Sequence, residues 1–373
     1  MRSLVHFFAP PCARVRRGLC WSAAFLPILF APCPSMAAEP PNTWVYENKL
    51  TPIAQPKTLL ADHPEWIEPI REAAHYEAPP LVRDEKADLA VRAWRFSYNA
   101  RGIIEIPNRL EKKATALIVV HPWGIDDGQG WRTPEPAGVV DFCTPVKNHL
   151  SHKHITGVLN PFLKAMRPRV AMLLYSQPGG EDPIRKKLYR SVRSTPTDAQ
   201  RAEGQKELTA KLNGFNYQGG SLPAKIALSK DRPVVDYFRQ FPGLDAGDHY
   251  DPPGFWGLPI PVVRGIETDP NDVMIYDAEG YPVLRDFLKK SGIRHVLLTG
   301  YATDMCLKAT TAGYVNLRQD FNVFLVADAS LATFPAAEGP ACATSAAVRF
   351  ASLDLLITQI SWVKPIETEG TRR

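Results

Sequence analysis

Cys306 is the residue whose setting points most directly to chemistry. It lies in the stretch HVLLTGYATDMCLKATTAGYVNL, residues 295–317, where a compact apolar run ending in glycine is followed by helical spacing. A thiol in the first turn of a helix lies close to unpaired backbone N–H groups and to the positive end of the helix dipole, which favour the thiolate. The same N–H groups can hold the oxyanion that forms when a thiolate attacks a carbonyl. Position alone favours a buried, unreactive cysteine, so this alternative stays open.

The wider segment LLTGYATDMCLKATTAGYVNLRQDFNVFLVADAS resembles a known nucleophile segment. It is similar to that of the isochorismatase-like cysteine hydrolases, which include nicotinamidases and N-carbamoyl amide hydrolases. The match falls on Gly300, Thr303, Cys306 and the pair Asp328-Ala329. The likeness runs through the order of strands from residue 116 to the C-terminus, and it leaves the N-terminal extension and a long insertion uncovered.

The resemblance implies a fold and a mechanism. The fold is α/β: a Rossmann-like six-stranded parallel sheet with helices on both faces. Cys306 would be the nucleophile, and the N–H groups of Ala302 and Cys306 would form the oxyanion hole. The resemblance also implies a cis peptide bond between Tyr301 and Ala302.

Two positions depart from the family pattern. The family has a catalytic Asp at the end of its first strand and a Lys at the end of its third, whereas this sequence has His121 and Asp277 there, or Tyr276 if the register slips by one residue. A Cys, a His and an Asp are the parts of a nucleophile activated by an imidazole that a carboxylate orients. Because His121 precedes Pro122, we expect it to have an extended backbone at the strand tip. We therefore predict a catalytic triad of Cys306, His121 and Asp277; the alternative is a non-catalytic relative that binds a small molecule.

Other candidates surround these strand ends. We assign substrate binding to Trp123, Asp126, Tyr276 and Tyr301. Asp126 and Asp127, in GIDDGQGW, are also alternatives for the family Asp after a loop shift, although turn-forming carboxylates are commonly structural.

We predict neither a metal site nor a cofactor. Some nicotinamidases bind a divalent ion near the second strand, but the corresponding YSQPGGED contains no histidine. In KNHLSHKH only His149 and His152 share a helical face, so we interpret this segment, which also holds His154, as a solvated helix. Neither a Gly-rich phosphate loop nor a serine elbow is apparent.

Hydrophobic patterning predicts the elements that position these residues. Alternating residues at 93–98 and 102–107 around Asn99-Ala100-Arg101 indicate a β-hairpin. Continuous apolar runs alternate with helical segments, which is typical of a parallel sheet covered on both faces. The runs are residues 116–120, 170–175, 273–276, 296–299 and 323–327, with 360–364 as a sixth strand after a helix near 341–356.

The connection between the second and third of these strands is unusually long. We place an insertion at about residues 179–265, with a helix at about 197–212. Its segment DHYDPPGFWGLP, residues 248–259, carries Tyr250, Phe255 and Trp256, which we interpret as a lid over the site or as a subunit contact in a homo-oligomer. A packing embellishment is the alternative.

The N-terminal segment reads as an export signal. Arg14, Arg16 and Arg17 precede an apolar stretch at 19–30, and small residues end at Ala38, so we predict a signal peptide at 1–38 and an exported protein, periplasmic or secreted. A retained membrane anchor is the alternative, although the stretch is short and contains Pro27. Residues 39–113 form an extension with the hairpin, and 114–373 the hydrolase domain.

Loss of the signal changes charge and cysteine content. It removes four of the 44 basic residues and no acidic one, which leaves a net charge of about +1. We therefore predict a small-molecule substrate, no nucleic-acid partner and no membrane contact after signal removal. Cys143, Cys306 and Cys342 remain, and we assign Cys143 and Cys342 to structure, either with or without a disulfide between them.

Overall fold

The computed structural model describes residues 43–72, 74–123, 145–214, 225–240, 258–332 and 340–366. The chain divides into two units, 1–45 and 46–373, and the account below concerns the second. The signal segment 1–38 lies outside the described residues, as do Asp126, Asp127 and Cys143, so those predictions stay predictions. Within the described ranges, no helix is both long and apolar enough to cross a membrane.

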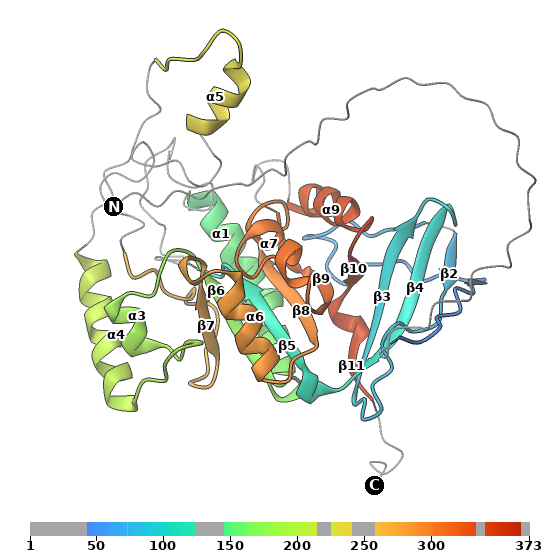
Figure 1. Ribbon diagram of the computed structural model, residues 1–373, viewed down its shortest axis with the longest axis horizontal. Helices are drawn as coiled ribbons and strands as arrows, with labels where there is room; N and C mark the ends of the chain where they lie inside the picture. The colour runs from blue at the N-terminus through green and yellow to red at the C-terminus, as the bar shows by residue number, and fades with distance from the viewer. Residues whose placement is uncertain are drawn as a thin grey trace, which may run out of the picture. The chain divides into compact units, whose positions relative to one another are not determined.

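A run of parallel strands forms the centre of the sheet, as predicted. Six strands of the described residues lie in the order β7-β6-β5-β8-β9-β10, from left to right in Figure 1, and all pairs between them are parallel. In chain order they are β5 (Thr115–Val120), β6 (Met172–Gln177), β7 (Val273–Tyr276), β8 (His295–Tyr301), β9 (Asn322–Leu331) and β10 (Leu356–Thr358). The first and fourth strands, β5 and β8, are neighbours, so the carboxyl ends of β5 and β8 meet at one edge.

The sixth strand differs from the prediction. It is β10, and the predicted run 360–364 is divided between the 3₁₀ turn η9 (Ile360–Trp362) and β11 (Val363–Pro365), which pairs with a strand of the N-terminal hairpin. The preceding helix α9 (Pro340–Ala351) ends earlier than expected.

Both faces of the parallel sheet are covered by helices because its strands are apolar on both sides. In β5, Ile118 contributes to one buried cluster and Leu117 to the other. The first cluster includes residues of α6 (Tyr281–Lys290), α7 (Cys306–Ala309), α8 (Tyr314–Leu317) and α9. The second includes residues of η3 (Ile155–Leu159, a π turn) and α2 (Asn160–Met166), which continue α1 (Pro145–His154). The turns η1 (Lys112–Ala114), η4 (Arg167–Arg169) and η7 (Asp277–Glu279) complete this part.

The N-terminal extension widens the sheet. The predicted hairpin is present as β3 (Leu89–Ser97) and β4 (Gly102–Leu110), each longer than expected. β3 pairs antiparallel with β10 and β11, while β4 pairs with β2 (His75–Glu77), which pairs with β1 (Thr51–Pro52). The hairpin is therefore part of the same sheet as the site (Figure 1).

The insertion between β6 and β7 contains helices. Its described parts are α3 (Pro183–Leu188), α4 (Asp198–Asn213) and α5 (Pro233–Gln240). α4 is the helix predicted at 197–212; Thr197 caps it in a reciprocal box with Gln200, which satisfies N–H groups at the helix start. Tyr250, Phe255 and Trp256 lie outside the described residues, so the lid stays a prediction.

Candidate active site

His121 stands directly after β5, at the edge of the sheet where the carboxyl ends meet. Its N–H donates to the Ser176 carbonyl at 2.9 Å, which continues the ladder between β5 and β6. The backbone then turns sharply: φ of His121 is +47°, so the extended conformation expected before Pro122 is wrong. The turn lets the Pro122 carbonyl accept from Val263 and brings Trp123 beside Val262. A positive φ at a non-glycine residue costs about 1–3 kcal/mol and is tolerated where the surroundings hold it.

A glycine on β8 permits the close approach of the two central strands beside His121. Gly300 pairs with Val120 and has φ +117°. A Cβ built on Gly300 would lie 2.2 Å from the Val120 carbonyl oxygen and 2.6 Å from its nitrogen, neither of which can move aside. Only glycine therefore fits at position 300, where β8 and β5 approach each other at the carboxyl edge of the sheet.

Asp277 reaches the imidazole from β7, across β6. Its Oδ2 lies 2.9 Å from Nε2 of His121, so the choice between Asp277 and Tyr276 falls on Asp277. The Thr311 hydroxyl donates to the Asp277 carbonyl at 3.0 Å, which ties the turn after β7 to the segment after Cys306. The other carboxylate oxygen, Oδ1, is buried and has no hydrogen-bond partner among the described residues.

The imidazole of His121 is strongly basic in this setting. It is 6% exposed, and burial by itself disfavours its charged form. Hydrogen bonds and charge interactions with Asp277 and Cys306 outweigh burial and raise the pKa of His121 to about 9. At neutral pH the ring therefore carries a proton, and its Nε2–H donates to Asp277 Oδ2. The structure thus brings the three predicted catalytic residues together.

Cys306, the third residue of the predicted triad, is the first residue of α7. It is 6% exposed, and its side chain packs in the cluster formed with α6 and α9. The helix that follows is only four residues long and a second short helix follows it, so the expected continuous helix is wrong and a helix dipole contributes little. The charged neighbour of the thiol is therefore the His121 imidazole rather than the end of a long helix.

Backbone amides suited to an oxyanion surround Cys306. The cis peptide bond between Tyr301 and Ala302 is present, as the resemblance implied. The Ala302 carbonyl accepts from the N–H groups of Met305 and Leu307. By contrast, the N–H groups of Ala302 and Cys306, both on buried residues, donate to no backbone carbonyl in the described part of the chain. Buried amides are normally paired, so these two are available to a ligand.

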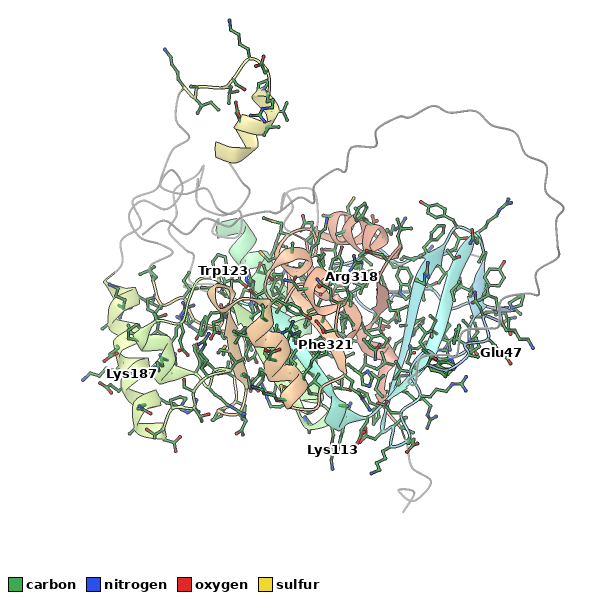
Figure 2. The ribbon with its side chains drawn as sticks, in the orientation of Figure 1. Glu47, Lys113, Trp123, Lys187, Arg318 and Phe321 are labelled. Atoms are coloured by element: carbon green, nitrogen blue, oxygen red, sulfur yellow. The ribbon has the colours of Figure 1, made fainter. Side chains whose placement is uncertain are left out.

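The residues assigned to substrate binding lie in different surroundings. Trp123 is half-buried at the same edge as His121, and Figure 2 labels it beyond β5, whose other end lies near Lys113. Tyr276 is fully buried, with the guanidinium carbon of Arg185 4.6 Å above the centre of its ring and a hydroxyl without a partner in the described residues. Tyr301 is buried, and its hydroxyl hydrogen-bonds His154.

His154 is a residue whose place in the site the sequence did not reveal. It was assigned to a solvated helix, but it is fully buried, with Nδ1 2.8 Å from the Tyr301 hydroxyl and Nε2 3.2 Å from the Asp328 carbonyl. Because a carbonyl only accepts, Nε2 carries the proton and Nδ1 accepts from Tyr301. Burial lowers the pKa of His154 to about 3, so the ring is neutral. The sequence does carry one sign of this burial: His154 is spaced four residues from Val158 and eight from Phe162, so it shares a helical face with these apolar residues.

The remaining cysteine and metal predictions concern residues away from the triad. Cys342 is exposed and forms no disulfide with another described residue; Cys143 lies outside the described residues, so a disulfide between the two stays a prediction. Among those residues, no group of three His, Cys, Asp or Glu side chains is arranged to hold a metal ion.

Comparison with known proteins adds a family match. Residues 224–352 match the profile of the isochorismatase domain. The matched range includes Asp277, the cis peptide and Cys306, whereas His121 precedes it. The chain has no significant match to a curated protein.

Several solved structures are similar to this chain. One is a cysteine hydrolase from Pseudomonas syringae pv. phaseolicola 1448A, with 14% identity, 68% of this chain and 91% of that chain covered, and a TM-score of 0.35. Another is an isochorismatase family protein from Desulfovibrio vulgaris subsp. vulgaris str. Hildenborough, with 12% identity, coverages of 66% and 95%, and a TM-score of 0.33. A nicotinamidase from Staphylococcus aureus has 10% identity, coverages of 66% and 99%, and a TM-score of 0.29. These TM-scores are all below 0.5, and the domain match covers residues 224–352, about a third of the chain.

Proposed function

We propose that this chain is a divergent member of the isochorismatase family and a cysteine hydrolase that cleaves a small amide or a related carbonyl compound. The observation that carries the proposal is the chain of contacts from Asp277 through His121 to Cys306, built from the ends of three strands. A neutral, buried cysteine without a base would need none of this arrangement.

The first half-reaction forms a thioester. The His121 imidazolium already holds the proton of the Cys306 thiol, and the thiolate attacks the substrate carbonyl carbon, so that the carbonyl π electrons move to the oxygen. The N–H groups of Ala302 and Cys306 hold this oxyanion. When the tetrahedral species collapses, the C–N bond breaks, and the leaving nitrogen takes the proton from the His121 imidazolium.

The second half-reaction restores the enzyme. His121, now neutral, takes a proton from water, whose oxygen attacks the thioester carbon. Collapse expels the Cys306 sulfur as the thiolate beside the His121 imidazolium and releases the acid, which restores the starting pair. Asp277 holds Nε2 throughout and stabilises each imidazolium, which leaves Nδ1 to exchange protons at the sulfur.

Unpaired oxygens near the strand ends support a substrate that carries N–H groups. Asp277 Oδ1, Gln177 Oε1 and Thr303 Oγ1 are buried and have no hydrogen-bond partner in the described residues. Gln177 pairs with Tyr276 in the β6–β7 ladder, next to Asp277. An amide or carbamoyl nitrogen offers the donors that such acceptors lack.

The test is ammonia release from a panel of small amides and carbamoyl compounds. Turnover by the wild-type protein, its loss in Cys306→Ala and His121→Ala, and its retention in the matched control Cys342→Ser are expected. If no compound of the panel is hydrolysed while one of them binds equally to wild type and Cys306→Ala, the non-catalytic binding protein replaces this proposal. We also propose that the protein is exported after cleavage near Ala38, on the basis of the basic, apolar and small residues of its N-terminal segment.

A further inference from the structure

A pocket of about 450 Å³ lies on the widened part of the sheet, away from Cys306. Between β8 and β3 the sheet has two intervening strands, β9 and β10, so β3 is roughly 15 Å from β8 at the usual strand spacing. The pocket belongs to the N-terminal extension and the C-terminal strand, neither of which contributes to the triad. None of its lining residues is a predicted site residue.

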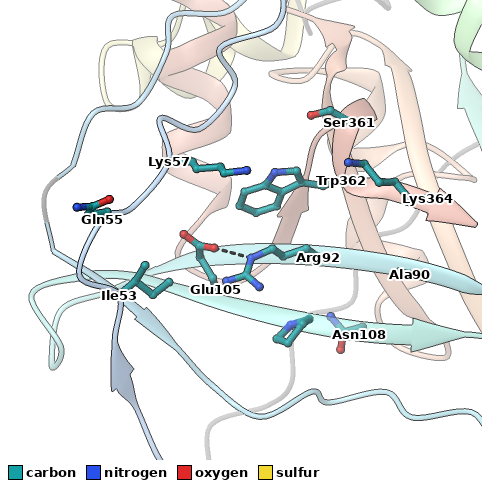
Figure 3. A pocket seen from close by; sticks show the side chains of 11 residues that line it. Ile53, Gln55, Lys57, Ala90, Arg92, Glu105, Asn108, Ser361, Trp362 and Lys364 are labelled. Carbon is teal, nitrogen blue, oxygen red and sulfur yellow. Dashed lines mark hydrogen bonds and ion pairs between the residues drawn. The ribbon is translucent and has the colours of Figure 1, made fainter. Parts of the chain in front are cut away.

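Strand register puts the floor of the pocket on one face. Arg92 stands opposite Pro107, and Lys364 opposite Ala90, so these side chains share a face of β11, β3 and β4. Trp362 forms a wall. The full lining is Ile53, Gln55, Lys57, Ala90, Arg92, Glu105, Pro107, Asn108, Ser361, Trp362 and Lys364 (Figure 3).

Some charged groups of this pocket have ion-pair partners, and others have none among the described residues. Glu105 is 4% exposed and fully engaged: its Oε1 lies 2.6 Å from His75 Nδ1 and its Oε2 accepts from Arg92 Nε at 2.5 Å. Arg92 also pairs with Glu77 at 2.8 Å, so its charge is balanced. Lys57 and Lys364 are exposed, and neither has an ion-pair partner among the described residues.

An aromatic surface lies between the two free cations. Figure 3 shows the amino groups of Lys57 and Lys364 on either side of the Trp362 ring. Trp362 is half-buried, and the Arg92 guanidinium carbon lies 5.7 Å from the centre of its ring. The indole thus offers a flat apolar face beside two positive charges, which suits a planar ligand with a negative group.

We propose that this pocket is a second small-molecule site, which binds a planar aromatic carboxylate by stacking on Trp362 and by ion pairing with Lys57 and Lys364. A cationic ligand does not fit, because the pocket's own carboxylate is already taken by His75 and Arg92. A small inorganic anion would leave the apolar wall unused.

Calorimetric titration of the full chain with 2-naphthoate tests the site. Saturable binding is expected for the wild type and for Cys306→Ala alike, so the result does not depend on the proposed hydrolase chemistry. The uncharged analogue 2-naphthalenemethanol and the ringless anion acetate should both bind more weakly. The double substitution Lys57→Gln/Lys364→Gln should weaken 2-naphthoate binding about tenfold, since two exposed ion pairs are lost.

Two further variants separate charge from stacking and from general surface effects. Trp362→Phe should retain most of the affinity, while Trp362→Leu should lose several-fold because the aromatic face is gone. Lys290→Gln, an exposed lysine on α6, should leave binding unchanged. The proposal is overturned if 2-naphthoate does not bind saturably, if the double variant binds within twofold of the wild type, or if Lys290→Gln weakens binding as much.

Discussion

Asp277→Asn probes the proposed catalytic centre through a single charge. Asparagine keeps the shape of the side chain and an oxygen near Nε2 of His121, but it removes the negative charge 2.9 Å from that nitrogen. Burial opposes the charged ring, whereas Asp277 and Cys306 together raise the pKa of His121 from 6.5 to about 9. That rise is a more than hundredfold gain in the proton affinity of His121. If Asp277 and Cys306 contribute equally to it, Asp277 accounts for somewhat more than a tenfold gain, and each tenfold corresponds to about 1.4 kcal/mol.

The thiol reports this loss directly. With a less basic His121, the imidazolium that stabilises a thiolate on Cys306 forms less readily. We therefore expect alkylation of Cys306 by iodoacetamide at pH 7 to slow by about tenfold in Asp277→Asn. His121→Ala should slow it at least as much.

The measurement is peptide-resolved mass spectrometry over time. Cys342, which is free and exposed, serves as an internal standard in the same sample, and wild-type Cys306 should react faster than Cys342 at pH 6. Asp286→Asn, an exposed carboxylate on α6, is the matched control and should change nothing. A Cys306 rate in Asp277→Asn within twofold of the wild type would refute the coupling between carboxylate, imidazole and thiol.

The other predictions concern packing, pH and processing. Gly300→Ala should lower the free energy of unfolding by more than about 3 kcal/mol, because the new Cβ meets the Val120 backbone at positive φ, whereas Gly157→Ala, with nothing within 4 Å, should be neutral or stabilising in the same urea titration. Burial raises the pKa of Asp328 to about 7, above its ordinary 3.8, so the folded state keeps a proton that the unfolded chain loses. Relative to Asp328→Asn, the wild type should therefore lose about 3 kcal/mol more stability between pH 5 and pH 8; an equal pH dependence in both would contradict this origin. N-terminal analysis of the protein from its native host should find a start near Glu39, and recovery of intact Met1 from the cytosol would rule out export.

The parallel sheet was predictable because its strands are buried on both faces. Continuous apolar runs such as those of β5 and β7 leave few alternatives, and the strand order that the resemblance implies places β5 beside β8. The last strand was misplaced because β10 has only three residues, and the longer apolar run after it was divided by the turn η9. Apolar content alone does not tell which of two short segments pairs with β9.

The site was predictable in its residues and less so in its backbone. Strand ends indicate which side chains meet, and this located His121 and Asp277. The positive φ of His121 depends on where the chain goes next, since Pro122 and Trp123 meet the segment around Val262 from a distant part of the sequence. The buried His154 was missed for a similar reason: its partners Tyr301 and Asp328 come from strands that the local helical pattern does not report.

The departures from the family pattern at the first and third strands have one electrostatic explanation. The resemblance implies an anion at the first position and a cation at the third, and this chain has the reverse: a His121 ring that is positive at neutral pH and the Asp277 carboxylate. The pair keeps one charge of each sign, so changing either residue alone to its family counterpart would create two like charges. His121→Asp should therefore destabilise the fold, while adding Asp277→Lys should recover part of that loss, with a coupling energy above about 1 kcal/mol in a double-mutant cycle of urea unfolding at pH 7. Additive effects of the two substitutions would mean that the charges at these strand ends act independently, and that the exchange of signs is not compensatory.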